Sequence, residues 1–159
     1  MKQMRNILVP TDFSANARVC FDKGVEIARE QAATLHLLHV VDVSLFGPPY
    51  IPQNGFVLPM EQEEVFTRLE QLRRDLPDLH VVIHACVGQP ATEIVNYAKD
   101  NEVDLICIST HGRRGLKRHL LGSTTEAVVR LAPCLVLSMH ADTSNTLASS
   151  APPADAAEH

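Results

Sequence analysis

Short apolar runs alternate with stretches of helical periodicity along this chain, and the alternation restricts its fold more than any other feature. The apolar runs predict five strands, over residues 6–9, 34–41, 79–87, 104–109 and 134–139. The periodic stretches predict four helices, over residues 14–28, 65–76, 91–99 and 122–131. Strands that are separated by helices at this interval indicate βαβ crossovers, and therefore a mainly parallel sheet with helices on both faces.

The length of 159 residues suits one domain. We expect an α/β, Rossmann-like, doubly wound open sheet of five mainly parallel strands in the order 3-2-1-4-5. Such sheets bind ligands outside the carboxyl ends of their strands, where the strand order reverses, here between the first and fourth strands. The domain is predicted to occupy residues 1–140, with a long Pro- and Gly-containing loop over 42–59. Residues 141–159 lack an apolar period and predict a disordered tail.

Composition excludes several classes of function. A net charge of −5, with 4% aromatic residues and no Trp, argues against a nucleic-acid binder. No apolar run approaches the ~20 residues that cross a bilayer, and we identify no signal peptide, so membrane insertion is not expected. The four cysteines form no C-x-x-C pair and predict reduced thiols in a cytoplasmic protein. They are Cys20, Cys86, Cys107 and Cys134.

The segment after the first strand carries an acidic residue at the mouth of the expected crevice. It reads Pro10-Thr11-Asp12-Phe13-Ser14. Asp12 could accept hydrogen bonds from a ribose or base, or reach a metal through water. Alternatively, Asp12 or Ser14 caps the first helix, which is the more common use of such residues.

The segment from Ser109 to Thr124, after the fourth strand, is the richest in possible ligand contacts. It contains glycines, four basic residues, and a Gly-Ser-Thr sequence that opens a helix. Backbone N–H groups at a helix start bind anions, and small residues let phosphates approach them. The segment is neither a Walker A loop nor a G-x-G-x-x-G fingerprint. Two alternatives remain: Ser123 and Glu126 could form a capping box, and the basic residues could be a solvated face.

The histidines outside this segment are weaker candidates for chemistry. His36 and His39 are expected on opposite faces of a strand, and His80 and His84 share a face but lie ~13 Å apart. Neither pair can chelate one metal ion, so we expect structural or surface roles. Beside the basic segment, His111 is the histidine that we expect to touch phosphate.

Several motifs in the same order resemble those of the universal stress protein family. The family's nucleotide-binding motif is G-x2-G-x9-G-[S/T], which matches Gly112 and Gly122-Ser123, while its first glycine is replaced by Ser109. The resemblance covers most of residues 5–139. It includes the segments 9–14, 38–42, 88–91 and 132–137.

The resemblance implies an ATP-binding stress-response or regulatory module, with ATP (or AMP or ADP) accompanied by Mg²⁺ or Mn²⁺. Asp12 would meet the ribose or adenine, Val40 would contact adenine, and Gly122, Ser123 and Thr124 would hold phosphates. The full set of residues implied at the site is Pro10, Thr11, Asp12, Val40, Ser109, His111, Gly112, Arg113, Gly122, Ser123 and Thr124. Ser109 would keep the ligand farther from the backbone than glycine does, because serine adds a Cβ and a hydroxyl.

Two other classes of function stay open from the sequence. One is a slow ATPase or adenylyl-transferring enzyme of the same superfold. Efficient catalysis is not expected, because the sequence shows neither a nucleophile beside a base nor a cluster of carboxylates. The other is a dimeric interaction protein that no longer binds nucleotide. Family members commonly dimerise, and the edge strand Cys134–Met139 has no proline or charge to discourage pairing across a two-fold axis.

Overall fold

The computed structural model of the chain describes residues 3–42, 59–110 and 122–140, with the side chains of 59–62 excepted. Strands and helices alternate through these residues, as the sequence predicts. In chain order they are β1 (Asn6–Pro10), α1 (Ala15–Gln31), β2 (Thr34–Asp42), α2 (Pro59–Arg74), β3 (Val81–Gly88), α3 (Pro90–Asp100), β4 (Leu105–Ser109), α4 (Ser123–Leu131) and β5 (Leu135–Met139).

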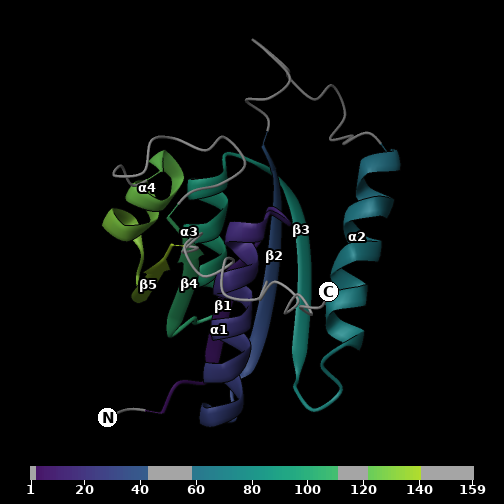
Figure 1. The fold of residues 1–159 in the computed structure, drawn as a ribbon. Coiled ribbons are helices and arrows are strands. Elements are labelled where there is room, and N and C mark those ends of the chain that lie inside the picture. The colour runs from purple at the N-terminus through teal and green to yellow at the C-terminus, as the bar shows by residue number, and fades with distance from the viewer. Residues whose placement is uncertain (1–2, 43–58, 111–121, 141–159) are drawn as a thin grey trace, which may run out of the picture.

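The five strands form one sheet in the order β3-β2-β1-β4-β5, and every neighbouring pair is parallel. Helices α1 and α2 cover one face, whereas α3 and α4 cover the other (Figure 1). The predicted doubly wound α/β fold and its strand order are therefore confirmed. The order reverses at β1, which lies between β2 and β4.

The core lies on both sides of β1, whose residues Ile7, Leu8 and Val9 are completely buried. Ile7 and Val9 join the hydrophobic cluster under α1 and α2, and Leu8 joins the cluster under α3 and α4. Successive side chains of a strand point to opposite faces, so a strand buried on both faces must be apolar throughout. This requirement explains the short continuous apolar run at the start of the chain.

The structure corrects some of the predicted boundaries. Helix α2 begins at Pro59 rather than near Val65, because residues 61–64 are Glu and Gln, which favour helix without adding an apolar period. Strand β3 begins at Val81 rather than Leu79, whose N–H instead donates to the Leu76 carbonyl in a turn. Residues 43–58 of the predicted loop and the predicted tail, 141–159, lie outside the described residues. No described helix has the length and apolarity to cross a membrane.

Gly24 lets α1 approach the sheet closely at its centre. A Cβ atom on Gly24 would lie 2.5 Å from Cγ2 of Val9 and 3.9 Å from Cβ of Cys107. Real Cβ atoms do not approach other carbons to 2.5 Å, so any side chain here must displace α1 or Val9. The absence of a side chain at position 24 therefore sets the spacing between α1 and the β1–β4 pair.

We expect Gly24→Ala to destabilise the protein by about 1–3 kcal/mol through overpacking. This loss should exceed the gain of about 1 kcal/mol that alanine normally brings to a helix interior. Urea denaturation measures the change in the free energy of unfolding. The double variant Gly24→Ala/Val9→Ala, compared with Val9→Ala alone, is the control: removing Cγ2 should abolish the penalty. An equal penalty in both backgrounds would contradict the steric explanation.

Candidate functional site

The sheet opens between β1 and β4 at its carboxyl end. Their pairing comprises Ile7 with Leu105 and Leu8 with Ile106, and stops before either strand ends. The pairings on either side continue further, to Pro10 with Leu38 and to Ser109 with Met139. The two central strands therefore part where the strand order reverses, which is the position of the predicted crevice.

The segment after β1 forms a tight, internally bonded turn into α1. The Asp12 carboxylate accepts a hydrogen bond from the Ser14 N–H at 2.9 Å, and the Thr11 hydroxyl accepts one from the Phe13 N–H at 3.0 Å. Ser14 is the N-cap of α1, and its hydroxyl accepts from the Ala17 N–H at 3.2 Å. Ser14 thus fulfils the predicted capping role, while Asp12 shapes the turn before it.

The end of β4 is bonded to the start of α4. The Gly122 N–H donates to the Thr110 carbonyl at 2.8 Å, and the Thr125 hydroxyl donates to the Ser109 carbonyl at 2.7 Å. The Thr110 N–H donates to the Met139 carbonyl at 2.9 Å, which joins β5 to the same group. These bonds hold the first turn of α4 directly beyond the carboxyl end of β4.

The structure contradicts the alternative in which Ser123 and Glu126 form a capping box. Gly122 is the N-cap of α4, which makes Ser123 the first helical residue, and the Glu126 N–H donates to the Gly122 carbonyl at 2.9 Å. A capping box needs the serine at the N-cap and the glutamate three residues later. With glycine at the N-cap, no side chain of that residue covers the first N–H groups of α4.

The predicted site residues fall into three groups along the carboxyl edge of the sheet. Pro10, Thr11 and Asp12 follow or end β1, Val40 lies near the end of β2, and the remaining described residues surround the β4–α4 junction. The latter are Ser109, Gly122, Ser123 and Thr124. His111, Gly112 and Arg113 lie outside the described residues.

Sequence reasoning did not single out Thr110, Thr125 or Phe13. Thr125 is buried, although it belongs to a Ser-Thr-Thr sequence that reads as polar helix surface. Phe13 has a φ of 61°, a left-handed conformation that bulky residues rarely adopt. The Phe13 ring contacts His39 of β2 and Arg68 of α2, which are distant in the chain, so the local sequence gives no sign of these contacts.

The histidines of β2 point to opposite faces, as predicted. His36 Nδ1 lies 3.0 Å from the Tyr97 hydroxyl, and its Nε2 lies 3.3 Å from Asn6 Oδ1. Burial, with a smaller contribution from His80, lowers the pKa of His36. His39 Nδ1 lies 2.8 Å from the Thr11 carbonyl oxygen, so it joins β2 to the turn that carries Asp12. The described residues contain no group of three or more His, Cys, Asp and Glu side chains arranged to hold a metal ion.

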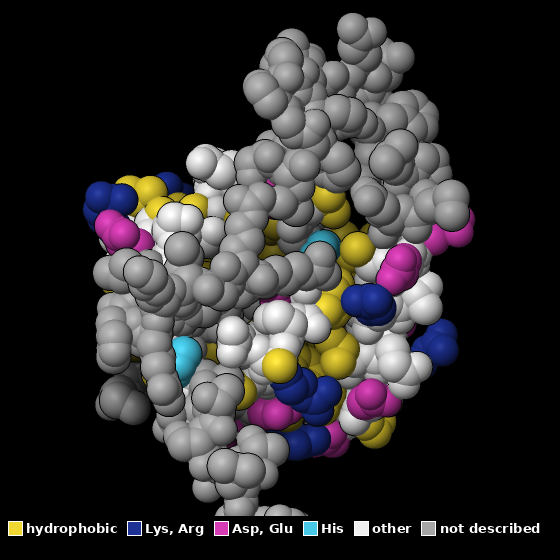
Figure 2. All heavy atoms as spheres, turned by 45° about the horizontal axis from the view of Figure 1, so that its top comes forward, with side chains coloured by type: hydrophobic (Ala, Val, Ile, Leu, Met, Phe, Trp, Pro, Cys, Tyr) yellow, Lys and Arg dark blue, Asp and Glu magenta, His cyan; other side chains and the backbone are white. Residues whose placement is uncertain are grey.

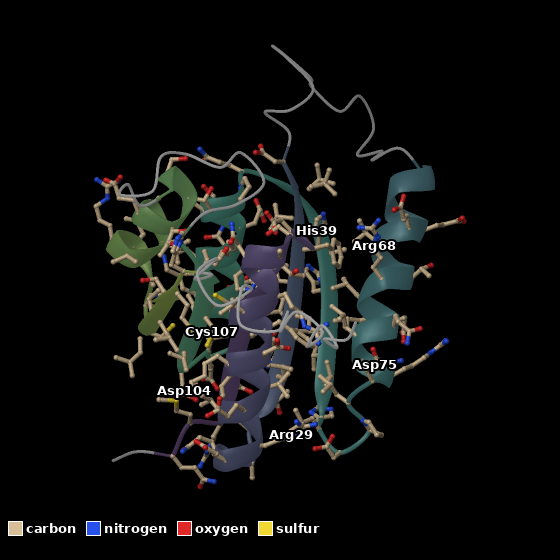
Figure 3. The ribbon with its side chains drawn as sticks, in the orientation of Figure 1. Arg29, His39, Arg68, Asp75, Asp104 and Cys107 are labelled. Carbon is tan, nitrogen blue, oxygen red and sulfur yellow. The ribbon has the colours of Figure 1, made fainter. Side chains whose placement is uncertain are left out.

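A groove of about 470 Å³ lies between α1 and α2, away from the strand ends. Phe21, Val25 and Leu72 are among its apolar lining residues, and both positive and negative side chains surround them. Figure 2 shows the same mixture of charges on the described part of this side of the molecule. Arg29 and Asp75, which line the groove, lie toward the opposite end of the sheet from His39 (Figure 3). The groove is therefore separate from the opening between β1 and β4.

Comparison with known proteins gives relatives over most of the chain. Residues 4–140 match the model of the universal stress protein family. The universal stress protein MJ0531 of Methanocaldococcus jannaschii is 35% identical over 136 residues, which cover 84% of this chain and 80% of that protein.

Solved structures of the same family share the fold. The universal stress protein UspA from Lactobacillus plantarum has a TM-score of 0.76 and 32% identity, covering 88% of this chain and 100% of that one. The universal stress protein from Archaeoglobus fulgidus, solved in complex with dAMP, has a TM-score of 0.62 and 19% identity over 87% of this chain and 98% of that one. Family match, relatives and fold agree: this chain belongs to the universal stress protein family.

Proposed function

We propose that this protein binds ATP at the opening between β1 and β4 and acts as a stress-response or regulatory module. The observation that carries the proposal is the early end of the β1–β4 pairing, with the Asp12 turn on one side and the first turn of α4 on the other. Ligands of doubly wound sheets bind at this position.

The start of α4 suits the phosphates. The first N–H groups of a helix carry partial positive charge and donate to anions. Gly122 at the N-cap leaves room for a phosphate to approach, and the hydroxyls of Ser123 and Thr124 add donors at the next two positions. The bonds from Gly122 to Thr110 and from Thr125 to Ser109 fix this turn against β4, so the donors need no reorganisation on binding.

The adenosine part of the ligand suits the other side of the opening. The half-buried Asp12 carboxylate is an acceptor that matches ribose hydroxyls, and Val40, near the end of β2, offers apolar contact for adenine. The fold neighbour from Archaeoglobus fulgidus that binds dAMP supports an adenine nucleotide as the ligand.

A divalent cation would accompany the triphosphate. Mg²⁺ is commonly bound through one or two carboxylates together with phosphate oxygens and waters, rather than by a cage of protein ligands. Asp12 is the acidic residue beside the opening that could join such a shell. Mg²⁺ or Mn²⁺ would neutralise phosphate charge.

The protein is further proposed to be a homodimer paired through β5. This strand is an edge of the sheet, and exposed edges favour pairing with another chain. Of the exposed large hydrophobic side chains in the described residues, Val129, Leu131 and Leu135 lie on α4 or β5, and Leu135 is 63% exposed. A second copy would cover these side chains and satisfy the backbone groups of the edge.

A cytoplasmic location is proposed from the cysteines. All four are free, and burial raises the pKa of the Cys107 thiol to about 12 and that of Cys20 to about 11. Buried protonated thiols are unreactive and typical of proteins in a reducing compartment.

Calorimetric titration should give a micromolar or lower dissociation constant for MgATP and much weaker binding of NAD. We expect Gly122→Val to weaken MgATP binding at least tenfold, because a branched side chain would occupy the approach to the first N–H groups of α4. The φ and ψ of Gly122, −60° and 146°, are accessible to valine, so the variant should fold.

The matched control for this variant is Gln89→Val, at the N-cap of α3, where no side-chain cap bond is made. It should leave MgATP binding unchanged. If folded Gly122→Val protein binds MgATP as tightly as the unaltered protein, the phosphates do not bind at α4.

Light scattering should give a mass near twice 17.5 kDa for the unaltered protein at tens of micromolar. We expect Leu135→Glu to shift the mass toward the monomer, since it places a charge on the apolar edge. Phe66→Glu is the control, because Phe66 is 47% exposed but lies on α2. A monomeric unaltered protein, or a dimer that Leu135→Glu leaves intact, contradicts pairing through β5.

A further inference from the structure

Beside the Asp12 turn, the Phe13 ring contacts two side chains from separate parts of the chain, His39 and Arg68. The Phe13 ring stacks on the His39 imidazole, with centroids 4.9 Å apart and planes at 23°. The Arg68 guanidinium carbon lies 5.3 Å from the centroid of the same Phe13 ring. His39 of β2 and Arg68 of α2 lie nearer the carboxyl end of the sheet than Asp75 and Arg29 do (Figure 3). We call this group the Arg68–Phe13–His39 stack.

Phe13 adopts a backbone conformation that is unfavourable for its residue type. Its φ of 61° lies in the left-handed region, which glycine adopts without steric cost and a β-carbon disfavours. Such strain persists where the surrounding contacts determine the conformation, and it concentrates at functional sites. Here the contacts are the stack itself, the hydrogen bond to Thr11, and packing against the cluster under α1 and α2.

His39 fixes the other end of the turn. Its Nδ1 must be protonated, since the Thr11 carbonyl can only accept the 2.8 Å hydrogen bond. The Thr11 N–H donates to the Leu38 carbonyl at 2.8 Å, so both backbone groups of Thr11 are held by β2. Asp12 therefore lies between two residues that are held in place: Thr11 is hydrogen-bonded to β2, and Phe13 is held by the stack.

Arg68 brings α2 into contact with this turn. Its Nη2 atom is 2.8 Å from Glu64 Oε1 one turn earlier on the helix, which holds the guanidinium group in place. The neighbouring Leu69 is completely buried in the cluster under α1 and α2. Arg68 thus links a helix that is fixed on the sheet to the ring that holds the Asp12 turn.

We propose that Arg68, Phe13 and His39 are positioning residues of the nucleotide site. The stack holds the Thr11–Ser14 turn so that the Asp12 carboxylate faces the ligand, and it couples the turn to α2. The inference rests on the proposed nucleotide function. Coupling between two sites is reciprocal, so nucleotide binding also stabilises the contact with α2.

The first test is the affinity for MgATP of Arg68→Met, which keeps the aliphatic length and removes the cation. The full energy of an exposed cation–π contact sets the upper limit of the expected effect, a dissociation constant weaker by about two- to fivefold at most. The matched control is Arg73→Met on the same helix, because Arg73 also pairs with a glutamate, Glu70, at 2.8 Å and is similarly exposed. Arg73→Met should bind MgATP with unchanged affinity.

A double-mutant cycle separates positioning from long-range charge. We expect Phe13→Leu to weaken MgATP binding more than Arg68→Met does, and Arg68→Met to have no further effect in the Phe13→Leu background. A loss of affinity through bulk charge would persist in that background. Persistence of the loss would therefore overturn the proposal.

Hydrogen exchange provides a readout that does not depend on affinity. MgATP at saturation should slow amide exchange in α2 around residues 65–74 of the unaltered protein and of Arg73→Met, but not of Arg68→Met. If the unaltered protein does not bind MgATP, the proposed function fails and this inference with it. If it binds, and Arg68→Met matches Arg73→Met in affinity and exchange, the inference alone is wrong.

Discussion

The structure depends on the parallel pairing of β1 with both β2 and β4. Ile7, Leu8 and Val9 are completely buried because helices cover both faces of the strand and other strands cover both edges. Such a strand can satisfy its backbone only through its neighbours, since no water reaches it. On the β4 side, however, the pairing stops before the strands end. The same strand therefore organises the core and leaves the opening in which a ligand can lie.

The alternation of short apolar runs and helical periods was sufficient to predict a mainly parallel sheet with helices on both faces. It does not determine the strand order, so the order 3-2-1-4-5 was an expectation that the structure confirms. The predicted boundaries of helices and strands were the least accurate part of the prediction. The first turns of α2 carry Glu and Gln rather than an apolar period, and at the start of α4 the sequence suggested a capping box at Ser123 and Glu126, whereas the N-cap is Gly122. The bond from the Gly122 N–H to the Thr110 carbonyl joins this helix start to the end of β4, and such a bond has no local sequence signal.

The site could be predicted only in part. Residues that end or follow a strand, such as Ser109 and Asp12, are recognisable because their position on the carboxyl edge follows from the fold class. Residues that act through packing across the chain are not. Phe13 reads as an ordinary apolar residue before a helix, and its left-handed backbone becomes intelligible only when His39 of β2 and Arg68 of α2 are beside it.

Gly24 has a consequence beyond the stability of α1. Its missing β-carbon lies over Val9, one residue before Pro10, and also close to Cys107 of β4. The distance between α1 and the sheet thus sets where the first turn of α1 lies relative to the ends of β1 and β4. The turn through Asp12, which leads into α1, is positioned in the same way. The contact of Gly24 with Val9, in the middle of the helix, therefore helps to set the width of the opening between β1 and β4. A family member with a larger residue at this position would need a smaller residue on β1 to keep the same distance between α1 and the sheet, and with it the same opening between β1 and β4.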